Sequence, residues 1–457
     1  MRYLTKQDIE EFAPAGLHPP DELDPAKPLR SAMQRYGIFK QEQLAGRVFP
    51  IACVALEITQ RCNLDCTLCY LSDLAEAVQD VPLFELERRL DVIHRHYGDY
   101  TTIQITGGDP TLRSIPELVK IVEMVKSRNM RAALFTNGIK ASRKMLLALS
   151  DAGLDDVVYH VDLTQERQGY ETEAELNAIR LEYIGRASGL PLRVIFNTTV
   201  FDGNFEEIPR LVSFFCDHAD AIDFASFQMQ ADTGRGILRE RDSTIITQQT
   251  VMAALEKGAR TKLGFDHPLV GHPDCNKYTA VMVCGSERTR LFDDEDFFGE
   301  VFNKLAILRG NWADTSLMTR KAIGTGLRHP GLLIGGLKFW TRKLWALRRG
   351  LLAGKRIHRI NFFIHNFMDA ERLERERCES CVFMVATAEG PLSMCVHNAK
   401  RDEMISKPVR NKDNRIIWNP LPNAEVRFAS DTLPLKKMKG RLRKDANQQR
   451  KALKKVS

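Results

Sequence analysis

The sequence predicts an α/β fold in which parallel β-strands alternate with α-helices. Two observations predict it. Six short runs are rich in Val and Ile, as strands are, and they alternate with segments in which apolar residues recur at three- and four-residue steps, as on one face of a helix. Such repetition requires right-handed crossovers between parallel strands, arranged as an open sheet or as a barrel.

The elements are predicted from these patterns in chain order. Strands are expected near 51–58, 102–106, 131–136, 156–161, 193–200 and 221–230, and helices near 84–97, 115–128, 141–152, 171–187, 205–217 and 248–260. Composition then divides the chain into a proline-containing N-terminal arm (1–50), the core (51–235), a linker region (236–310), a basic amphipathic segment (311–360), a cysteine-bearing region (361–430) and a basic tail (431–457).

Cysteine usage indicates the compartment. Ten cysteines in 457 residues are too few for a disulfide scaffold, and most of them cluster at 62–69 and 378–395, which is typical of metal ligation in a reducing cytosol. The first residues mix charges where a signal peptide needs an apolar run, and no apolar run approaches spanning length. We therefore expect a cytoplasmic protein that is neither secreted nor integral to a membrane.

Three of these cysteines follow the first predicted strand at C-x3-C-x2-C spacing: Cys62, Cys66 and Cys69. Three thiolates on one short loop can hold three irons of a four-iron, four-sulfur cluster and leave the fourth iron open. Zinc takes four ligands, and a disulfide would leave one of the three thiols unpaired, so both fit poorly. The loop therefore predicts an iron–sulfur cluster with one open iron at the carboxyl edge of the strands.

Polar and glycine-rich turns end the next three predicted strands, where ligands bind in parallel α/β sheets. Paired glycines let a backbone approach a ligand closely, although an Asn-Gly or Asp-Pro turn is also ordinary. An alternating strand would point the two polar residues at its end toward one face, and the histidine among them equally suits a buried core position. The residues are Gly107, Gly108 and Asp109; Thr136, Asn137 and Gly138; and His160 and Asp162.

Together with the cysteine loop, these turns resemble the radical S-adenosylmethionine superfamily over residues 51–230. The resemblance implies a partial (β/α)6 TIM-like barrel and a cluster whose open iron chelates the amino and carboxylate groups of S-adenosylmethionine. The Gly107–Asp109 turn is similar to the superfamily's G-G-E-P segment, which holds the amino group mainly through backbone carbonyls. The Thr136–Gly138 turn is similar to its T-N-G, placed near the cosubstrate, and Asp162 is expected to contact the ribose.

A second cysteine group predicts another metal site. Cys378, Cys381 and Cys395 are clustered, and Cys275 is available as a fourth ligand, with Cys284 competing for that place. A C-x2-C pair could equally be half of a zinc site. We favour an auxiliary four-iron, four-sulfur cluster in a C-terminal auxiliary domain, because the chain already carries one predicted cluster.

Basic charge is concentrated in two segments. Residues 315–368 contain eleven Lys and Arg and no Asp or Glu, and the tail from 436 to 455 contains ten basic residues against one acid. A stripe at helical spacing runs through the first segment: Leu333, Leu337, Trp340, Leu344, Leu347 and Leu351. This composition favours an interfacial helix on an anionic membrane surface, and hence peripheral association. RNA is the rival partner for a basic tail, but no RNA-binding module is recognisable, so nucleic acid is not expected.

The C-terminal half resembles the tetraether lipid synthase-like branch of the same superfamily. The resemblance is carried by His272-Pro273-Asp274-Cys275, by the run from His365 to Asp369, and by the three clustered C-terminal cysteines. It implies radical coupling of lipid chains at unactivated carbons, with a ferredoxin or flavodoxin as electron donor. A peptide- or RNA-modifying radical enzyme, and an iron–sulfur sensor or scaffold without turnover, are the alternatives.

Overall fold

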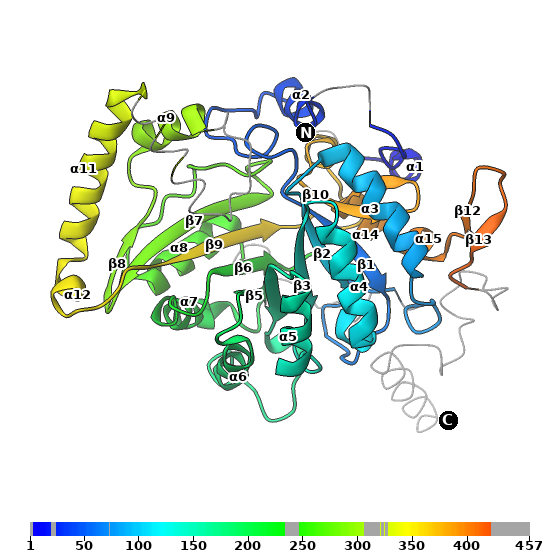
Figure 1. Ribbon diagram of the computed structural model, residues 1–457, viewed down its shortest axis with the longest axis horizontal. Helices are drawn as coiled ribbons and strands as arrows, with labels where there is room; N and C mark the ends of the chain where they lie inside the picture. The colour runs from blue at the N-terminus through cyan, green and yellow to red at the C-terminus, as the bar shows by residue number, and fades with distance from the viewer. Residues whose placement is uncertain are drawn as a thin grey trace, which may run out of the picture.

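The computed structural model describes residues 3–19, 24–72, 74–233, 246–305, 320, 324 and 328–421. Figure 1 shows one large sheet that runs through this part of the chain, with helices packed against it. The basic tail predicted at 431–457 lies outside the described residues, as do parts of the linker region and of the basic segment.

The central sheet confirms the predicted α/β class. Its eleven strands lie in the order β11-β10-β1-β2-β3-β4-β5-β6-β9-β7-β8. The run from β10 through β9 is parallel throughout, and only β11, β7 and β8 are antiparallel to their neighbours. All six predicted strands are present: β1 (Cys53–Thr59), β2 (Thr102–Gly107), β3 (Arg131–Thr136), β4 (Asp156–His160), β5 (Arg193–Val200) and β6 (Phe224–Met229).

The predicted helices fill the crossovers: α3 (Leu83–Tyr97), α4 (Ile115–Lys126), α5 (Arg143–Asp151), α6 (Asn177–Ala187) and α7 (Ile208–Asp217), followed by α8 (Gln248–Ala259). Local signals start them where the pattern predicts. Ser114 and Glu117 form a capping box at the start of α4, and the Ser142 side chain caps α5. Their apolar faces bury the side of the sheet that carries Ile103 and Ile105 of β2. The alternate residues Gln104 and Thr106 therefore face the opposite side, where a cavity lies.

Two further parallel strands come from the C-terminal half, which the sequence pattern did not predict. β9 (His358–Asn366) pairs with β6, and β10 (Phe383–Thr387) pairs with β1. The two ends of this parallel run approach each other, because the ring of Phe383 lies 4.6 Å from that of His365 and 5.8 Å from that of Phe363. The parallel strands thus curl into a barrel-like shape, and the cysteine-bearing region contributes to the same sheet as the core.

Short elements surround the β10 side of the sheet: α1 (Lys6–Glu11), α2 (Lys27–Arg35), α13 (Arg375–Glu379), β11 (Gly390–Ser393), α14 (Met394–Ala399), α15 (Arg401–Ser406), β12 (Val409–Arg410) and β13 (Ile416–Trp418). The N-terminal arm packs on them. Leu4 shares a small buried cluster with Leu373, Cys378 and Cys395, and its backbone N–H donates to the Leu373 carbonyl at 2.8 Å.

The opposite edge is formed by β7 (Asn276–Cys284), β8 (Glu287–Arg290), α9 (Glu295–Leu305), α11 (Pro330–Ala346) and α12 (Arg348–Leu352). Figure 1 shows α11 at the outer edge of the molecule, beside α9. Phe339 and Leu347 anchor this layer by packing with Met282 and Cys284 of β7 in a small core of their own. Within the described part of the chain, no helix combines the length and apolarity needed to cross a bilayer.

Candidate functional site

A cavity of about 570 Å³ lies at the carboxyl ends of the parallel strands, a volume suited to a cosubstrate or a small ligand. Residues from both halves of the chain line it. They include Cys62, Cys66, Cys69, Gly107, Gly108, Thr136, Asn137, His160 and Thr199 from the core, and Phe367, Met368, Met394, Asn398 and Arg401 from the C-terminal half. The structure thus brings most of the predicted core site residues to one cavity.

The cysteine loop follows β1, and its three thiols are partly exposed to the cavity. The loop is fastened to the ends of two strands. Asn137 Nδ2 donates to Asn63 Oδ1 at 2.7 Å, and the backbone N–H of Thr67 donates to the carbonyl of Thr164 at 2.7 Å. Three accessible thiols that face one wall of a cavity fit the donor set of a four-iron cluster with an open iron.

Gly107 and Gly108 permit a close backbone approach. The backbone that approaches them is that of the residues leading into the cysteine loop. A Cβ on Gly107, whose φ is +124°, would lie 1.9 Å from the Thr59 carbonyl oxygen, and one on Gly108 would lie 2.0 Å from that of Arg61. The backbone N–H of Gly108 donates to the Thr59 carbonyl at 2.9 Å. The two glycines therefore seat β2 directly against the residues that precede Cys62, while their own backbone lines the cavity.

Asp109 is fully buried, and its carboxylate faces the protein behind the cavity wall. It accepts hydrogen bonds from the backbone N–H groups of Thr111 and Asn137, each at 2.9 Å, and from Thr136 Oγ1 at 2.9 and 3.0 Å. Burial raises the pKa of Asp109, and these hydrogen bonds oppose the rise. Asp109 thus joins the ends of β2 and β3 and positions the cavity wall; the contact with the cosubstrate predicted for it stays a prediction.

The turn after β3 places Asn137 on the cavity and Gly138 behind it. Gly138 has a φ of +81°, and a Cβ there would lie 2.1 Å from the ring of Tyr183 on α6. A glycine is thus required both for the backbone conformation and for the close approach of α6. The carbonyl of Asn137 accepts from Arg167 Nη2 at 2.6 Å, which fixes the turn from the other side.

His160 and Asp162 form an ion pair at the end of β4, with His160 Nε2 2.7 Å from Asp162 Oδ2. His160 lines the cavity and its side chain is 32% exposed, whereas Asp162 is fully buried. Burial raises the pKa of Asp162, but His160 and the hydrogen bonds from Thr164 and Thr199 outweigh it and bring the pKa to about 2. Burial lowers the pKa of His160, and Asp162 more than reverses this. The His160 imidazole is therefore the group that reaches the cavity, and the ribose contact predicted for Asp162 stays a prediction.

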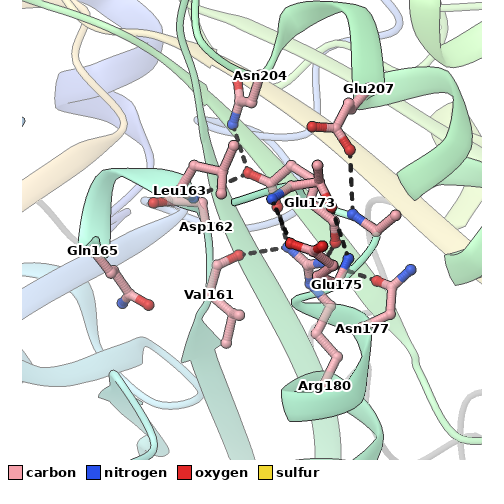
Figure 2. A network of polar contacts seen from close by, with 12 residues as sticks. Val161, Asp162, Leu163, Gln165, Glu173, Glu175, Asn177, Arg180, Asn204 and Glu207 are labelled. Carbon is pink, nitrogen blue, oxygen red and sulfur yellow. Dashed lines mark hydrogen bonds and ion pairs between the residues drawn. The ribbon is translucent and has the colours of Figure 1, made fainter. Parts of the chain in front are cut away.

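A buried polar network supports this pair (Figure 2). Arg180, fully buried on α6, forms an ion pair with Glu173 and donates to the Val161 carbonyl at 2.8 Å. Glu173 accepts from the backbone N–H of Leu163 at 3.1 Å and from Asn204 Nδ2 at 2.7 Å. The same Asn204 group donates to the Thr199 carbonyl at 2.8 Å, so the network holds together the ends of β4 and β5, where His160 and Thr199 enter the cavity.

The C-terminal cysteines form a second group of thiols in the adjacent region. Arg377 Nε donates to Cys275 Sγ at 3.1 Å. Burial raises the pKa of the Cys275 thiol to about 12, with Arg377 opposing and Cys381 adding to the rise. Burial likewise raises the pKa of Cys378 and of Cys395, and the other thiols of the group add to it. Four thiols that act on one another in this way are a donor set that a bound cluster or metal ion would convert to thiolates.

Cys284, the competing fourth ligand, lies at the far end of the nine-residue strand β7, which begins directly after Cys275. Its thiol donates to the Lys355 carbonyl at 3.4 Å and packs in the small core under α11 and α12. The structure therefore groups Cys275 with the C-terminal cysteines. Among the residues described, no three His, Cys, Asp or Glu side chains surround one point closely enough to hold a single metal ion. The auxiliary cluster stays a prediction.

Comparisons with known proteins find a family match over the core of the chain. A model of the Radical SAM superfamily matches residues 56–215. The chain is similar to 7,8-dihydro-6-hydroxymethylpterin dimethyltransferase of Methanocaldococcus jannaschii, with 27% identity over 186 residues, covering 39% of this chain and 36% of the relative. It is similar to PqqA peptide cyclase of Methylorubrum populi, with 27% identity over 166 residues, covering 36% of this chain and 42% of the relative. Streptococcus suis SuiB bound to precursor peptide SuiA aligns with a TM-score of 0.36 and 15% identity, covering 50% of this chain and 48% of that chain.

The matched segment coincides with the strand and helix repeats. It begins within β1 and ends within α7, and so contains the three cysteines and the turns after β2, β3 and β4. The chain spans 36% and 42% of the length of the two curated relatives. The superfamily uses a four-iron, four-sulfur cluster and S-adenosylmethionine, which the cavity-lining thiols fit. Over residues 56–215 the chain therefore matches the Radical SAM superfamily, and this segment carries the cysteine loop and the turns that line the cavity.

Proposed function

We propose that this protein is a radical S-adenosylmethionine enzyme that modifies an unactivated carbon, in a membrane lipid chain. The observation that carries the radical chemistry is the opening of Cys62, Cys66 and Cys69 onto the same cavity as Gly107, Gly108 and Asn137. The three thiolates would hold the cluster. When bound, the cluster and S-adenosylmethionine supply a 5′-deoxyadenosyl radical, which abstracts hydrogen from a carbon of the substrate.

The chain's own residues position the reactants and exclude water. The backbones of Gly107 and Gly108 provide carbonyl groups beside the cysteine loop, and His160, oriented by Asp162, offers a ring nitrogen to a hydroxyl or carboxylate in the cavity. Electrons are proposed to come from a ferredoxin or flavodoxin. An auxiliary cluster held by the C-terminal thiols would accept an electron from the substrate radical.

The cavity lining combines polar and apolar side chains. Carboxamides and hydroxyls come from β2 and from the carboxyl ends of β5 and β6: Gln104, Asn197, Thr199, Gln228 and Gln230. Apolar side chains come from the cysteine loop and the C-terminal half: Leu68, Leu71, Phe367, Met368, Val385 and Met394. The apolar residues suit a hydrocarbon chain, because burial of each CH₂ group is worth about 0.8 kcal/mol. This composition supports a substrate with an aliphatic portion.

The exposed face of α11 and α12 supports a membrane surface as partner. Large apolar side chains are 45 to 87% exposed on these two helices: Leu333, Ile334, Leu337, Trp340, Leu344, Trp345 and Leu352. The basic residues Lys338, Arg349, Lys355 and Arg356 are exposed beside them. Apolar insertion next to bases is the pattern of a helix that lies in the interface of an anionic leaflet.

The structure corrects the predicted stripe in two respects. Leu347 is fully buried and packs toward β7, whereas Ile334 and Trp345, outside the stripe, are exposed. The basic segment also meets acids from outside it, because Arg342 pairs with Asp294 at 3.1 Å and Lys343 with Asp293 at 2.7 Å. The proposed docking face therefore differs from the sequence pattern, and two bases of the segment, one exposed and one buried, are paired with acids.

The docking face and the cavity lie at opposite ends of β9. This nine-residue strand begins after α12 and ends beside the cavity residues Phe367 and Met368, so the two places are about 30 Å apart along it. In the proposal, α11 and α12 tether the enzyme to the surface, and the lipid reaches the cavity by a separate entrance.

Peptide modification is the second candidate function. The carboxamides among the lining residues favour it, since Asn and Gln side chains pair well with peptide groups. A curated relative that matches the core is a peptide cyclase. In this reading the apolar lining residues would contact an apolar side chain of the peptide.

Expression in a host that lacks the gene tests the lipid proposal. Mass spectrometry of total lipids should show species that have lost two hydrogens as two chains joined, and a Cys62→Ala variant expressed at the same level should show none of them. An unchanged lipid profile, together with a modified peptide in the same cells, would replace the lipid substrate by a peptide and leave the radical chemistry standing.

A further inference from the structure

An arginine from the C-terminal half is inserted beside the cysteine loop. Arg401, the first residue of α15, is 1% exposed and lines the cavity. Its guanidinium binds both carboxylate oxygens of Glu57 on β1, with Nη1 2.9 Å from Oε2 and Nη2 2.6 Å from Oε1. Gln60 Nε2 donates to the same carboxylate at 2.9 Å. Such a planar, two-point pair fixes the orientation of both partners.

The same guanidinium covers the residue that follows the third cysteine. Arg401 Cζ lies 4.6 Å from the centre of the Tyr70 ring, and the Tyr70 hydroxyl donates to the Gly107 carbonyl at 2.8 Å. Burial alone would lower the pKa of Arg401, but the Glu57 carboxylate more than reverses this. The guanidinium thus places a permanent positive charge over the residue next to Cys69, and the turn at Cys69 and Tyr70 is held between Arg401 and the end of β2.

Arg401 is also tied to the C-terminal cysteine group. One residue, Lys400, separates it from α14, which carries Cys395, and its Nη2 is 3.4 Å from Oδ1 of Asn398 on that helix. Figure 1 shows α14 and α15 on the side of the sheet where β10 and β1 lie. Cys378 and Cys381 lie just before β10, and Cys62 follows β1. The short helix α14 thus connects Cys395, a ligand of the predicted auxiliary site, to Arg401, which contacts the cysteine loop of the first site.

We propose that Arg401 is a positioning residue of the first cluster site: it fixes the turn at Cys69 and Tyr70, and makes the placement of that turn depend on the C-terminal cysteine group. Its fixed charge near Cys69 also favours the reduced state of a cluster bound there, which carries one more negative charge. The inference rests on the proposed four-iron cluster, and iron analysis of the parent protein tests that premise separately.

The test uses the full-length protein, reconstituted anaerobically and reduced. S-adenosylmethionine is titrated while the electron paramagnetic resonance spectrum of the first cluster is recorded, and the spectral change gives the Kd for S-adenosylmethionine. A redox titration gives the midpoint potential of the cluster. Arg401→Gln should raise the Kd at least tenfold and lower the potential, with parent iron content. Arg401→Lys should recover the potential, because it keeps the charge, but not the Kd, because it loses the two-point pair and the stacking.

Two further variants test the same inference if Arg401→Gln does not fold. Tyr70→Leu removes the stacking and the hydrogen bond to Gly107 but keeps the pair with Glu57, and it should also raise the Kd. Arg193→Gln breaks a two-point pair with Asp156 at the opposite ends of the strands and should leave the Kd and potential unchanged. A Kd for S-adenosylmethionine equal to that of the parent protein in both Tyr70→Leu and Arg401→Lys would overturn the proposal.

A double-mutant cycle tests the dependence on the C-terminal cysteines. The double substitution Cys378→Ala with Cys381→Ala should raise the Kd for S-adenosylmethionine in the parent protein. In the Arg401→Gln protein it should raise the Kd little further. Tyr70→Leu replaces Arg401→Gln as the second background if Arg401→Gln does not fold. Equal effects in both backgrounds, or none in the parent, would refute the dependence.

Discussion

Replacing Cys62, Cys66 and Cys69 together with Ala is expected to remove one cluster and to abolish cleavage of S-adenosylmethionine. The parent protein should bind about eight irons if both cysteine groups hold four-iron clusters, and the variant about four. The effect is large because, within the described part of the chain, these three cysteines are the ones that line the cavity. Anaerobic reconstitution, iron and sulfide analysis, and chromatography of the nucleoside product measure it.

The matched control is Cys378→Ala with Cys381→Ala. These thiols belong to the other group, so this variant should also bind about four irons but retain the spectrum of the open-iron cluster. A parent protein with about four irons and bound zinc would contradict the auxiliary cluster. A triple variant that still formed 5′-deoxyadenosine would contradict the assignment of the first site.

Changing Trp340, Leu344 and Trp345 to Ser is expected to release the protein from vesicles that contain anionic lipid. All three side chains are exposed, and the loss of three apolar side chains that would each contribute about 1.5 kcal/mol or more on insertion predicts a fall in partitioning of at least about 1,000-fold. Flotation with anionic and neutral vesicles, at low and high salt, measures it. Neutral vesicles and high salt should each weaken capture of the parent protein, because the bases contribute about 1 kcal/mol each at an anionic surface.

Leu147→Ser with Leu181→Ser is the control for this experiment. Both leucines are about half exposed, on α5 and α6, and lie outside the docking face. The control should bind vesicles like the parent protein. A different result would favour a nucleic acid as the partner: vesicles would still capture the Trp340, Leu344 and Trp345 variant, binding would depend mainly on the basic tail, and the protein would also bind RNA.

The regular part of the fold could be predicted because its signals are local. Neighbouring residues contain these signals. Examples are the alternation of apolar and polar residues at Ile103, Gln104 and Ile105 in β2, and the Ser114 cap of α4. β9 and β10 could not be predicted to join the core, since their partners β6 and β1 lie far away in the chain and pairing leaves no local pattern. The same holds for the contact of Phe383 with His365 that brings the ends of the sheet together.

The candidate site divides in the same way. Motif spacing predicted the cysteine loop and the turns of Gly107 and Asn137, which line one cavity. Which polar group faces the cavity depends on tertiary partners, so Asp109 and Asp162 turned out to lie behind the wall while His160 reaches it. The position of Arg401 against Glu57 had no sequence signal, because a buried ion pair between distant residues is defined only by the fold.

The most direct measurement is the product analysis of the reduced, anaerobically reconstituted parent protein incubated with S-adenosylmethionine. We expect 5′-deoxyadenosine and methionine in equal amounts, formed without any added substrate and lost in the Cys62, Cys66 and Cys69 variant. If the cluster is shown spectroscopically to be intact and reduced, and no 5′-deoxyadenosine forms with or without candidate substrates, the cavity does not perform radical chemistry, and an iron–sulfur sensor or scaffold becomes the function that the structure supports.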